Sequence, residues 1–297
     1  MKKQNWSAGR TLLAEIIADN NFGLADSYED LFTTTGQAKA SVNREIMFAT
    51  QYLAPNSVHR LRPGAGGLDI ELGWYALMQP YKNLVDDYEM KDGKRPPDSD
   101  LYDAAKPYEN RDPRLYATVR LPGDVWTNPS TGETGPIYNT YTGFHTKKWV
   151  DLRRIPFTAA TASQSDQDYI HLRYADILLM YAEAVNELDG AVNTVYEQLD
   201  LVRGRTTVGL PAVDRAVYNT KEKLREYIRH ERRIEFALEG HRYNDLKRWK
   251  IAHTLLPTLK NPSGVSYVFE EHNYRLPFSI TELDNNPQLD QNDGYIK

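Results

Sequence analysis

Apolar residues recur every three or four positions in three stretches of the sequence, and this spacing predicts amphipathic helices. Near the N-terminus, Leu12, Leu13, Ile16 and Ile17 predict a helix over residues 7–20. From Ile170 an apolar stripe runs to Leu188, and a second stripe covers residues 192–202. The intervening Asp189-Gly190 predicts that these two helices form an αα-hairpin.

The third stretch, residues 224–249, is the most informative part of the sequence. Leu224, Ile228 and Leu238 lie on one face of a predicted helix. Thr220 precedes this helix as a candidate N-cap, because its hydroxyl can accept a hydrogen bond from a free backbone N–H. Gly240 is expected to end the helix in a left-handed C-terminal cap.

Two glutamates interrupt the apolar face of this third helix. Glu231 and Glu235 stand between Ile228 and Leu238, where a carboxylate must be paired to be tolerated. We predict structural ion pairs with arginine, whose planar guanidinium suits bidentate pairing. The alternative is a catalytic carboxylate pair, but abundant arginine keeps carboxylates ionised whereas a general acid needs a raised pKa. The arginines close in sequence are Arg225, Arg229, Arg232, Arg233, Arg242 and Arg248.

Residues 33–166 are rich in loops, with short segments that predict strands. Residues 45–52, 115–121 and 137–144 are rich in β-branched and aromatic residues, which favours strands. The glycine-rich segment 63–69 lacks the lysine and hydroxyl residue of a phosphate-binding loop and is interpreted as a flexible loop. Long connections within a compact domain are typical of binding or interface loops. The tail, residues 274–295, is predicted to be extended, with Leu276 and Ile280 buried.

Aromatic residues provide the candidates for ligand binding. The sequence holds 20 tyrosines and 5 tryptophans, whose flat faces and polar edges suit stacking on sugar rings and also fill cores. Several lie in or beside loops rather than on helical stripes, and two arginines beside the glycine-rich loop could bond hydroxyls or carboxylates. Trp74 is the leading candidate, with core packing as its alternative. The candidate ligand-binding residues are Arg60, Arg62, Trp74, Tyr75, Trp126 and Tyr141.

No cofactor or metal is predicted. The chain has no cysteine, so disulfides and thiolate metal sites are excluded. His230-Glu231 lacks the second histidine of a zinc-protease helix. The acidic residues of 86–92 do not fit a helix–loop–helix calcium site; a solvated acidic turn is predicted, and an irregular Ca²⁺ site is the alternative.

Composition limits the function classes only broadly. With 297 residues, 40% hydrophobic and 26% charged, the chain has the composition of a soluble globular protein. Its net charge of −5 argues against nucleic-acid binding, which needs a basic surface. No run of residues has the length of a transmembrane helix.

Four ordered blocks of the sequence together form a specific signal. The most specific is ERRIEFALEGHRYNDLKRW at 231–249; the others are LRYADILLMYAEAVNEL at 172–188, LVDDYEMKDG at 84–93 with NRDPRLYATV at 110–119, and LPFSITELDNNPQLDQNDGY at 276–295. These blocks resemble the SusD/RagB family of nutrient-binding outer-membrane lipoproteins. The sequence is similar to the C-terminal portion of that family. The family's N-terminal half, with its signal peptide and lipidation cysteine, has no counterpart in it.

The resemblance implies a mainly α fold, with a tetratricopeptide-like helical layer and a loop-rich region carrying short β-hairpins. Residues 1–32 would end the helical-repeat layer, 33–166 would form the ligand or interface region, and 167–297 would hold the hairpin, the Glu/Arg-rich helix and the tail.

The same resemblance implies a function without catalysis. The protein would bind a glycan at the bacterial cell surface and deliver it to a TonB-dependent SusC-like transporter. It would be anchored by lipid in the outer membrane as a full-length protein. Three alternatives stay open: a peptide-binding member of the family, a helical-repeat scaffold for protein interactions, and a glycoside hydrolase.

Overall fold

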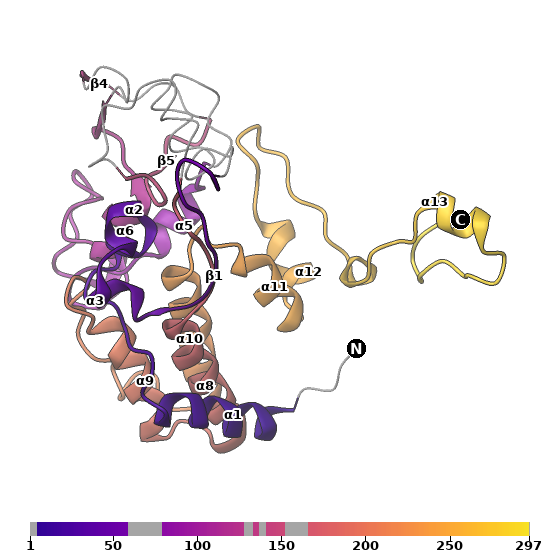
Figure 1. The fold of residues 1–297 in the computed structure, drawn as a ribbon, viewed down its shortest axis with the longest axis horizontal. Coiled ribbons are helices and arrows are strands. Elements are labelled where there is room, and N and C mark those ends of the chain that lie inside the picture. The colour runs from indigo at the N-terminus through magenta and orange to yellow at the C-terminus, as the bar shows by residue number, and fades with distance from the viewer. Residues whose placement is uncertain (1–4, 59–78, 128–132, 137–140, 152–165, 297) are drawn as a thin grey trace. The chain divides into compact units, whose positions relative to one another are not determined.

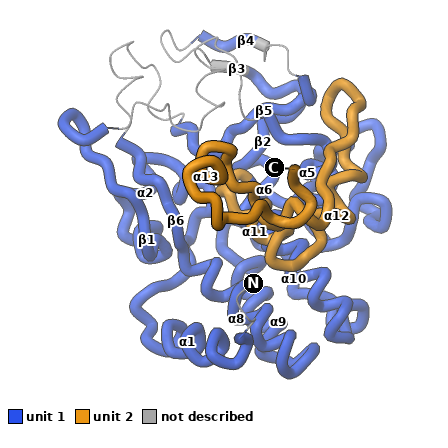
Figure 2. Tube along the Cα trace, turned by 90° about the vertical axis from the view of Figure 1, so that its right-hand side faces the viewer, with its two compact units in different colours: residues 1–237 blue, residues 238–297 orange. Residues whose placement is uncertain are grey.

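A computed structural model describes the chain except residues 1–4, 59–78, 128–132, 137–140, 152–165 and 297 (Figure 1). It divides into two compact units, residues 1–237 and residues 238–297 (Figure 2). Helices dominate the described part and the strands are short, which confirms the predicted mainly α fold class.

Four helices of unit 1 form its helical layer. The central helix of the layer packs against each of the other three (Figure 1). Their apolar stripes meet in the main core. Leu178, Leu199 and Leu224 of this core are almost fully buried. The four helices are α1 (Trp6–Ala18), the central α8 (Tyr174–Asp189), α9 (Asn193–Arg203) and α10 (Lys221–Glu235).

Local signals fix most boundaries of these helices. The side chain of Thr220 accepts a hydrogen bond from the Lys223 N–H, which confirms the predicted N-cap of α10. Gly190 separates α8 from α9 with a φ of 80°, a conformation that glycine adopts without a steric penalty. The predicted αα-hairpin is therefore confirmed.

One helix begins later than its apolar stripe predicted. Ile170 belongs to the strand β6 (Tyr169–Arg173), which pairs antiparallel with β1 (Ile46–Thr50). Helix α8 starts only at Tyr174, after this ribbon. The prediction was wrong because Ile170 is a buried residue of a short strand. It lies four positions before Tyr174, so its apolar side chain also fits the spacing of a helical stripe.

The loop-rich part of unit 1 contains short elements around two smaller cores. One core groups Phe32, Trp149 and Leu210, and the other groups Val85, Leu115 and Phe144. The elements are η1 (Glu29–Phe32), α2 (Thr34–Gln37), α3 (Ala40–Asn43), α5 (Lys82–Asp87), η2 (Pro96–Asp98), α6 (Pro113–Thr118), β2 (Val119–Arg120), β3 (Val125–Thr127), β4 (Thr134–Pro136) and β5 (His145–Thr146). Strands β2 and β5 pair antiparallel, as do β3 and β4.

The strand predicted over residues 115–121 is wrong for most of its length. Residues 113–118 form helix α6, because Asp112 caps its N-terminus by accepting from the Arg114 N–H and Pro113 has the fixed φ of a first helical residue. Of the strand predicted over 137–144, residues 137–140 lie outside the described residues, and 141–144 are not in a strand.

Unit 2 is small and has a core of its own. Leu246, Ala252 and Phe269 are buried there, between α11 (His241–Arg248), α12 (Ala252–Leu255) and the following segment. Gly240 is left-handed as predicted, with a φ of 84°, but it precedes α11, while α10 already ends at Glu235. The remaining elements are η4 (Leu256–Thr258), η5 (Glu271–Tyr274) and α13 (Ile280–Asn285).

The C-terminal tail differs from its prediction in one respect. Ser279 and Glu282 form a capping box that starts α13 within the otherwise extended segment. Leu276 and Ile280 are 71% and 74% exposed, so their predicted burial is wrong.

Candidate functional site

Two of the six candidate ligand-binding residues, Trp126 and Tyr141, belong to the described part of the chain. Arg60, Arg62, Trp74 and Tyr75 lie outside the described residues. Trp126 is in β3, opposite Gly135 of β4. Tyr141 has a side chain that is 85% exposed, and its backbone N–H donates to Gln79 Oε1 over 2.9 Å. A shared site of these six residues therefore stays a prediction.

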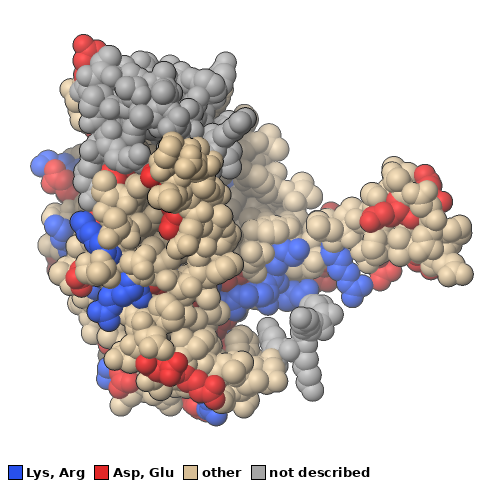
Figure 3. Space-filling model, in the orientation of Figure 1, with Lys and Arg blue, Asp and Glu red and all other residues tan. Residues whose placement is uncertain are grey.

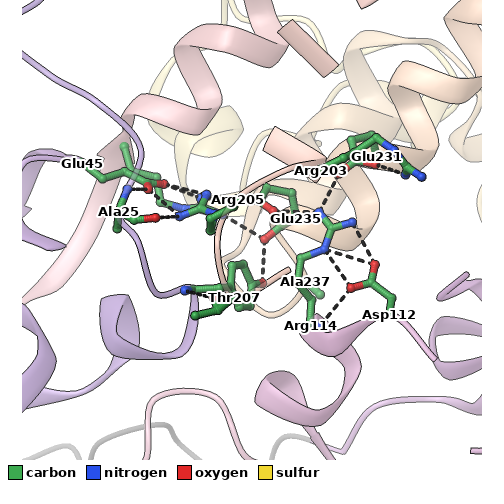
Figure 4. A network of polar contacts seen from close by, with 12 residues as sticks. Ala25, Glu45, Asp112, Arg114, Arg203, Arg205, Thr207, Glu231, Glu235 and Ala237 are labelled. Carbon is green, nitrogen blue, oxygen red and sulfur yellow. Dashed lines mark hydrogen bonds and ion pairs between the residues drawn. The ribbon is translucent and has the colours of Figure 1, made fainter. Parts of the chain in front are cut away.

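The structure does bring together a buried cluster of carboxylates and guanidinium groups, at the C-terminal end of α10 (Figure 4). Glu235 lies at its centre and is fully buried. Its Oε1 accepts from Arg173 Nη1 over 2.7 Å and from Arg205 Nη2 over 2.8 Å. Its Oε2 accepts from Arg114 Nη1 over 2.8 Å. Three guanidinium groups from three segments of the chain thus converge on one carboxylate.

Glu231, one helical turn earlier, is bound by two arginines. Arg114 Nη1 donates to its Oε1 over 2.5 Å and Arg203 Nη1 donates to its Oε2 over 3.1 Å. Arg114 also donates through Nη2 to Asp112 Oδ2 over 2.8 Å. The helix cap of α6 is therefore part of the same network, and it fixes the guanidinium that joins both glutamates.

Glu45 extends the cluster to the start of β1. Its Oε1 accepts from Arg173 Nη1 over 2.8 Å, and its Oε2 accepts from Arg205 Nη1 and from the Ala25 N–H, each over 2.6 Å. Two guanidinium groups are therefore shared between Glu45 and Glu235. The network connects β1, β6, α6, the segment after α9 and α10, which are far apart in sequence.

Glu89 forms the other end of the cluster. Arg203 Nη2 lies 2.9 Å from its Oε2, while His230 Nε2 lies 3.3 Å from its Oε1. Tyr227 donates its hydroxyl to Oε1 over 3.1 Å. Burial raises the pKa of Glu89, but the hydrogen bond from His230 and the charge of Arg203 outweigh it and lower the pKa to about 2. This carboxylate is part of the core, so the predicted solvated acidic turn is wrong at Glu89.

The environment of Glu235 is unsuited to acid–base catalysis. Burial raises the pKa of its carboxyl, but the charges of the surrounding guanidinium groups outweigh burial and hold the pKa far below the ordinary value of 4.5. Glu231 and Glu235 are both fully buried, and each oxygen is already bonded to arginine. Neither carboxylate therefore has an oxygen free to donate a proton to a substrate or to accept one from it.

The partners of the two glutamates are not the arginines nearest in sequence. Arg225 pairs with Glu187, Arg229 with Glu226, Arg232 with Asp176 and Arg233 with Asp87. Arg248 pairs with Asp245, three residues before it on α11. The arginines that matter, in Asp112-Pro113-Arg114, Leu172-Arg173 and Arg203-Gly204-Arg205, carry no local signal that assigns them to α10.

No described residues form a metal site. Groups of three or more histidines and carboxylates able to hold an ion are absent from the part of the chain that the structure describes. Within the acidic segment, Asp86 pairs with Lys82 and Asp87 pairs with Arg95. Asp92 accepts from Ser99.

A small cavity lies beside the network in unit 1. Its volume is about 270 Å³, below the range of about 300–1,000 Å³ usual for small-molecule sites. Among its lining groups, Tyr28 donates its hydroxyl to the Glu235 carbonyl and Lys147 donates to the Tyr116 carbonyl. These polar groups are already bonded within the protein, so the cavity offers little to a ligand.

Membrane crossing by a helix finds no support in the described residues. None of their helices is both long enough and apolar enough to span a bilayer.

The sequence and the helix-rich fold both place the chain in a known class of protein. The sequence matches the SusD family over residues 29–295, so the chain belongs to this family and the resemblance is confirmed. Among its relatives, SusD-like protein P38 of Formosa agariphila is 26% identical over an alignment of 316 positions, which covers 99% of this chain and 57% of that protein.

Solved structures of the family share the fold. A SusD-like carbohydrate binding protein from Bacteroides fragilis superposes with a TM-score of 0.74 at 26% identity, covering 95% of this chain and 61% of that one. Surface glycan-binding protein A from Bacteroides thetaiotaomicron superposes with a TM-score of 0.65 at 20% identity, covering 97% and 59%. The chain therefore spans less than two thirds of the length of each of these relatives.

Proposed function

We propose that this protein binds a glycan without catalysis at the bacterial cell surface and delivers it to a TonB-dependent SusC-like transporter. The observation that carries the proposal is membership of the SusD family over residues 29–295. A structural neighbour at 26% identity is named as a carbohydrate binding protein, which supports the ligand class. The protein would act in the outer membrane, lipid-anchored in its full-length form.

The ligand region is proposed to be residues 33–166, with Arg60, Arg62, Trp74, Tyr75, Trp126 and Tyr141 as contacts. Sugar rings present C–H faces that stack on aromatic rings, and their hydroxyls suit the polar edges of tyrosine and the donors of arginine. The exposed side chain of Tyr141 is available for such a contact. Trp74 is proposed as the main stacking residue, because a tryptophan offers the largest aromatic face.

The environment of Glu231 and Glu235, the carboxylate pair that the sequence analysis considered as catalytic, supports a function without catalysis. Glu231 and Glu235 are buried and bonded to arginine, so they hold the fold together rather than face a substrate. A glycoside hydrolase would need two carboxyl groups on either side of a bound sugar, one of them protonated. This pair meets neither condition.

The test is affinity electrophoresis of the full chain through gels that contain amylopectin, xylan or laminarin. The wild-type protein is expected to be retarded by at least one of them. Trp74→Ala should raise the dissociation constant derived from the retardation by roughly tenfold, as expected for loss of one aromatic stacking contact, and should leave the far-UV spectrum unchanged. Leu12→Ala is the matched control, because Leu12 is a 61% exposed residue of α1.

Two outcomes would contradict this proposal. Release of reducing sugar from the retarding polysaccharide, with wild-type but not with a single carboxylate variant, would make the protein a hydrolase. Absence of retardation combined with saturable binding of an oligopeptide mixture would place it among peptide binders.

A further inference from the structure

The ribbon formed by β1 and β6 carries aromatic side chains on its exposed face. Along β6, Ile170 is buried and Leu172 is half-buried while Tyr169 and His171 between and before them are exposed, which follows the two-residue repeat of a strand. On β1, Phe48 is 63% exposed. We call Phe48, His171 and Tyr169 the aromatic strip.

The three rings of the aromatic strip form one continuous surface. The ring centroids of Phe48 and His171 lie 5.2 Å apart, and those of His171 and Tyr169 lie 5.0 Å apart. These separations are within the range of contacting aromatic pairs. Single exposed apolar residues need no explanation, but three contiguous rings on a soluble surface are typical of an interaction site.

Neighbouring side chains hold the rings of Tyr169 and His171 in place. The ring of Tyr169 stacks on that of Trp149, with 5.7 Å between centroids and 14° between planes. Trp149 is itself buried and meets Phe32 of the core edge-on at 4.9 Å. The His171 ring is fixed by its Nε2, which lies 2.7 Å from Thr50 Oγ1. A surface that is ordered before binding loses little conformational entropy when a ligand arrives.

The backbone at Trp149 is a second, independent observation. Its φ is 77°, a left-handed conformation that is unfavourable for a bulky side chain. Strained backbone of this kind is retained at sites where the resulting geometry matters. At this site, the residue with the left-handed backbone is the one whose indole ring stacks on the exposed ring of Tyr169.

The chemistry of the aromatic strip indicates its ligand. The exposed positions of the two strands carry aromatic rings and one hydroxyl residue, with no lysine, arginine or carboxylate among them. The surface over β1 is correspondingly almost without charged side chains (Figure 3). Rings with polar edges, such as Tyr169 with its hydroxyl, match a neutral sugar that has both C–H faces and hydroxyl groups.

A protein partner fits this surface less well. A stable protein–protein interface buries about 800 Å² on each partner, and it needs some 20–30 residues a side. The aromatic strip and Thr50 are only four side chains on a two-stranded ribbon. Their extent is that of a subsite for a few sugar units.

We propose that the aromatic strip is a carbohydrate subsite, which takes the ring faces of a neutral oligosaccharide and consists of residues other than the six contacts proposed above. This inference rests on the proposed glycan binding. It assigns to Phe48 and Tyr169 the stacking contacts, and to Trp149 the support of the Tyr169 ring.

The test uses the same gels of amylopectin, xylan and laminarin, with variants of the aromatic strip. Phe48→Ala and Tyr169→Ala are each expected to raise the dissociation constant by roughly three- to tenfold, as loss of one aromatic contact does. Tyr169→Phe keeps the ring and should retain binding within about twofold of the wild type. Phe48 contacts the core so little that its removal should leave the far-UV spectrum unchanged, and Leu12→Ala is again the control.

The outcomes separate this inference from the proposed function. Retardation that is weakened by Trp74→Ala but not by Phe48→Ala or Tyr169→Ala would overturn the subsite and leave glycan binding standing. No retardation of the wild type by any of the three polysaccharides would overturn both. A change in oligomeric state on size exclusion with Phe48→Ala, without a change in retardation, would make the strip a protein contact and overturn the subsite.

Discussion

Replacing Glu235 by glutamine should strongly destabilise unit 1. Glutamine keeps the size and shape of the side chain and removes only its negative charge. Arg173 and Arg205, which Glu235 shares with Glu45, would each lose one carboxylate partner while their guanidinium groups stay fully buried. Arg114 would lose one of its acceptors at the same time. The amide nitrogen of glutamine would also point a donor at a guanidinium group.

The magnitude follows from the burial of these groups. Removing one partner of a buried ion pair costs about 3–5 kcal/mol, because the remaining charge stays in a medium that solvates it poorly. Folded domains have a total free energy of unfolding of about 5–15 kcal/mol. With a urea dependence of about 3 kcal/mol per M, the midpoint of unfolding should fall by about 1 M or more.

The assay is urea unfolding followed by far-UV circular dichroism, with Glu226→Gln as the matched control. Glu226 lies on the same helix and pairs with Arg229, but its side chain is 69% exposed. An exposed pair contributes only about 0.2–1 kcal/mol, so the control midpoint should barely move. If Glu235→Gln unfolded at the same urea concentration as Glu226→Gln, the claim that the buried network holds unit 1 together would be refuted.

Three further predictions concern pH and local backbone structure. Because the pKa of Glu89 is lowered from 4.5 to about 2 in the fold, its contribution to stability is present above pH 4.5 and is lost as the pH falls towards 2. The urea midpoint of unfolding, measured at a series of pH values between 5 and about 2, should fall accordingly. In Glu89→Gln the midpoint should depend less on pH over this interval. Thr220→Ala should lower the free energy of unfolding by about 1 kcal/mol, because the Lys223 N–H loses its cap, and thermal melts would measure it. Gly36→Ala should unfold at lower temperature, since an added Cβ would lie 2.1 Å from the Asp30 carbonyl oxygen, whereas Gly9→Ala has open space within α1 and should stabilise it by about 0.5–1 kcal/mol. A Gly36→Ala protein as stable as the wild type would contradict the packing at that turn.

Where short-range signals act, the sequence predicted the structure well. The hydroxyl of Thr220, the freedom of Gly190 and the apolar spacing of residues 12–17 each act within one or two helical turns. A cap or stripe of this kind needs no knowledge of the rest of the chain. The failure at residues 115–121 had a local remedy too, because Asp112-Pro113 is a helix start that the strand-like composition obscured.

The proposed binding surfaces show a different limit. Tyr169 and Phe48 are separated by more than a hundred residues, and neither position is distinctive in the sequence. Only the antiparallel pairing of β1 with β6 places them on one face. The candidate ligand residues in segment 59–78 stay predictions, since aromatic residues in loops can serve a core as well as a ligand.

By itself, the sequence determined that Glu231 and Glu235 lie on a buried face and require positive partners, because helical periodicity places them there and an unpaired buried carboxylate is too costly. It also determined the family, through four ordered blocks of residues. Only the tertiary structure decided which arginines supply the charge. Arg114, Arg173 and Arg205 come from three other segments, and long-range packing rather than distance along the chain sets which guanidinium groups can reach a buried carboxylate.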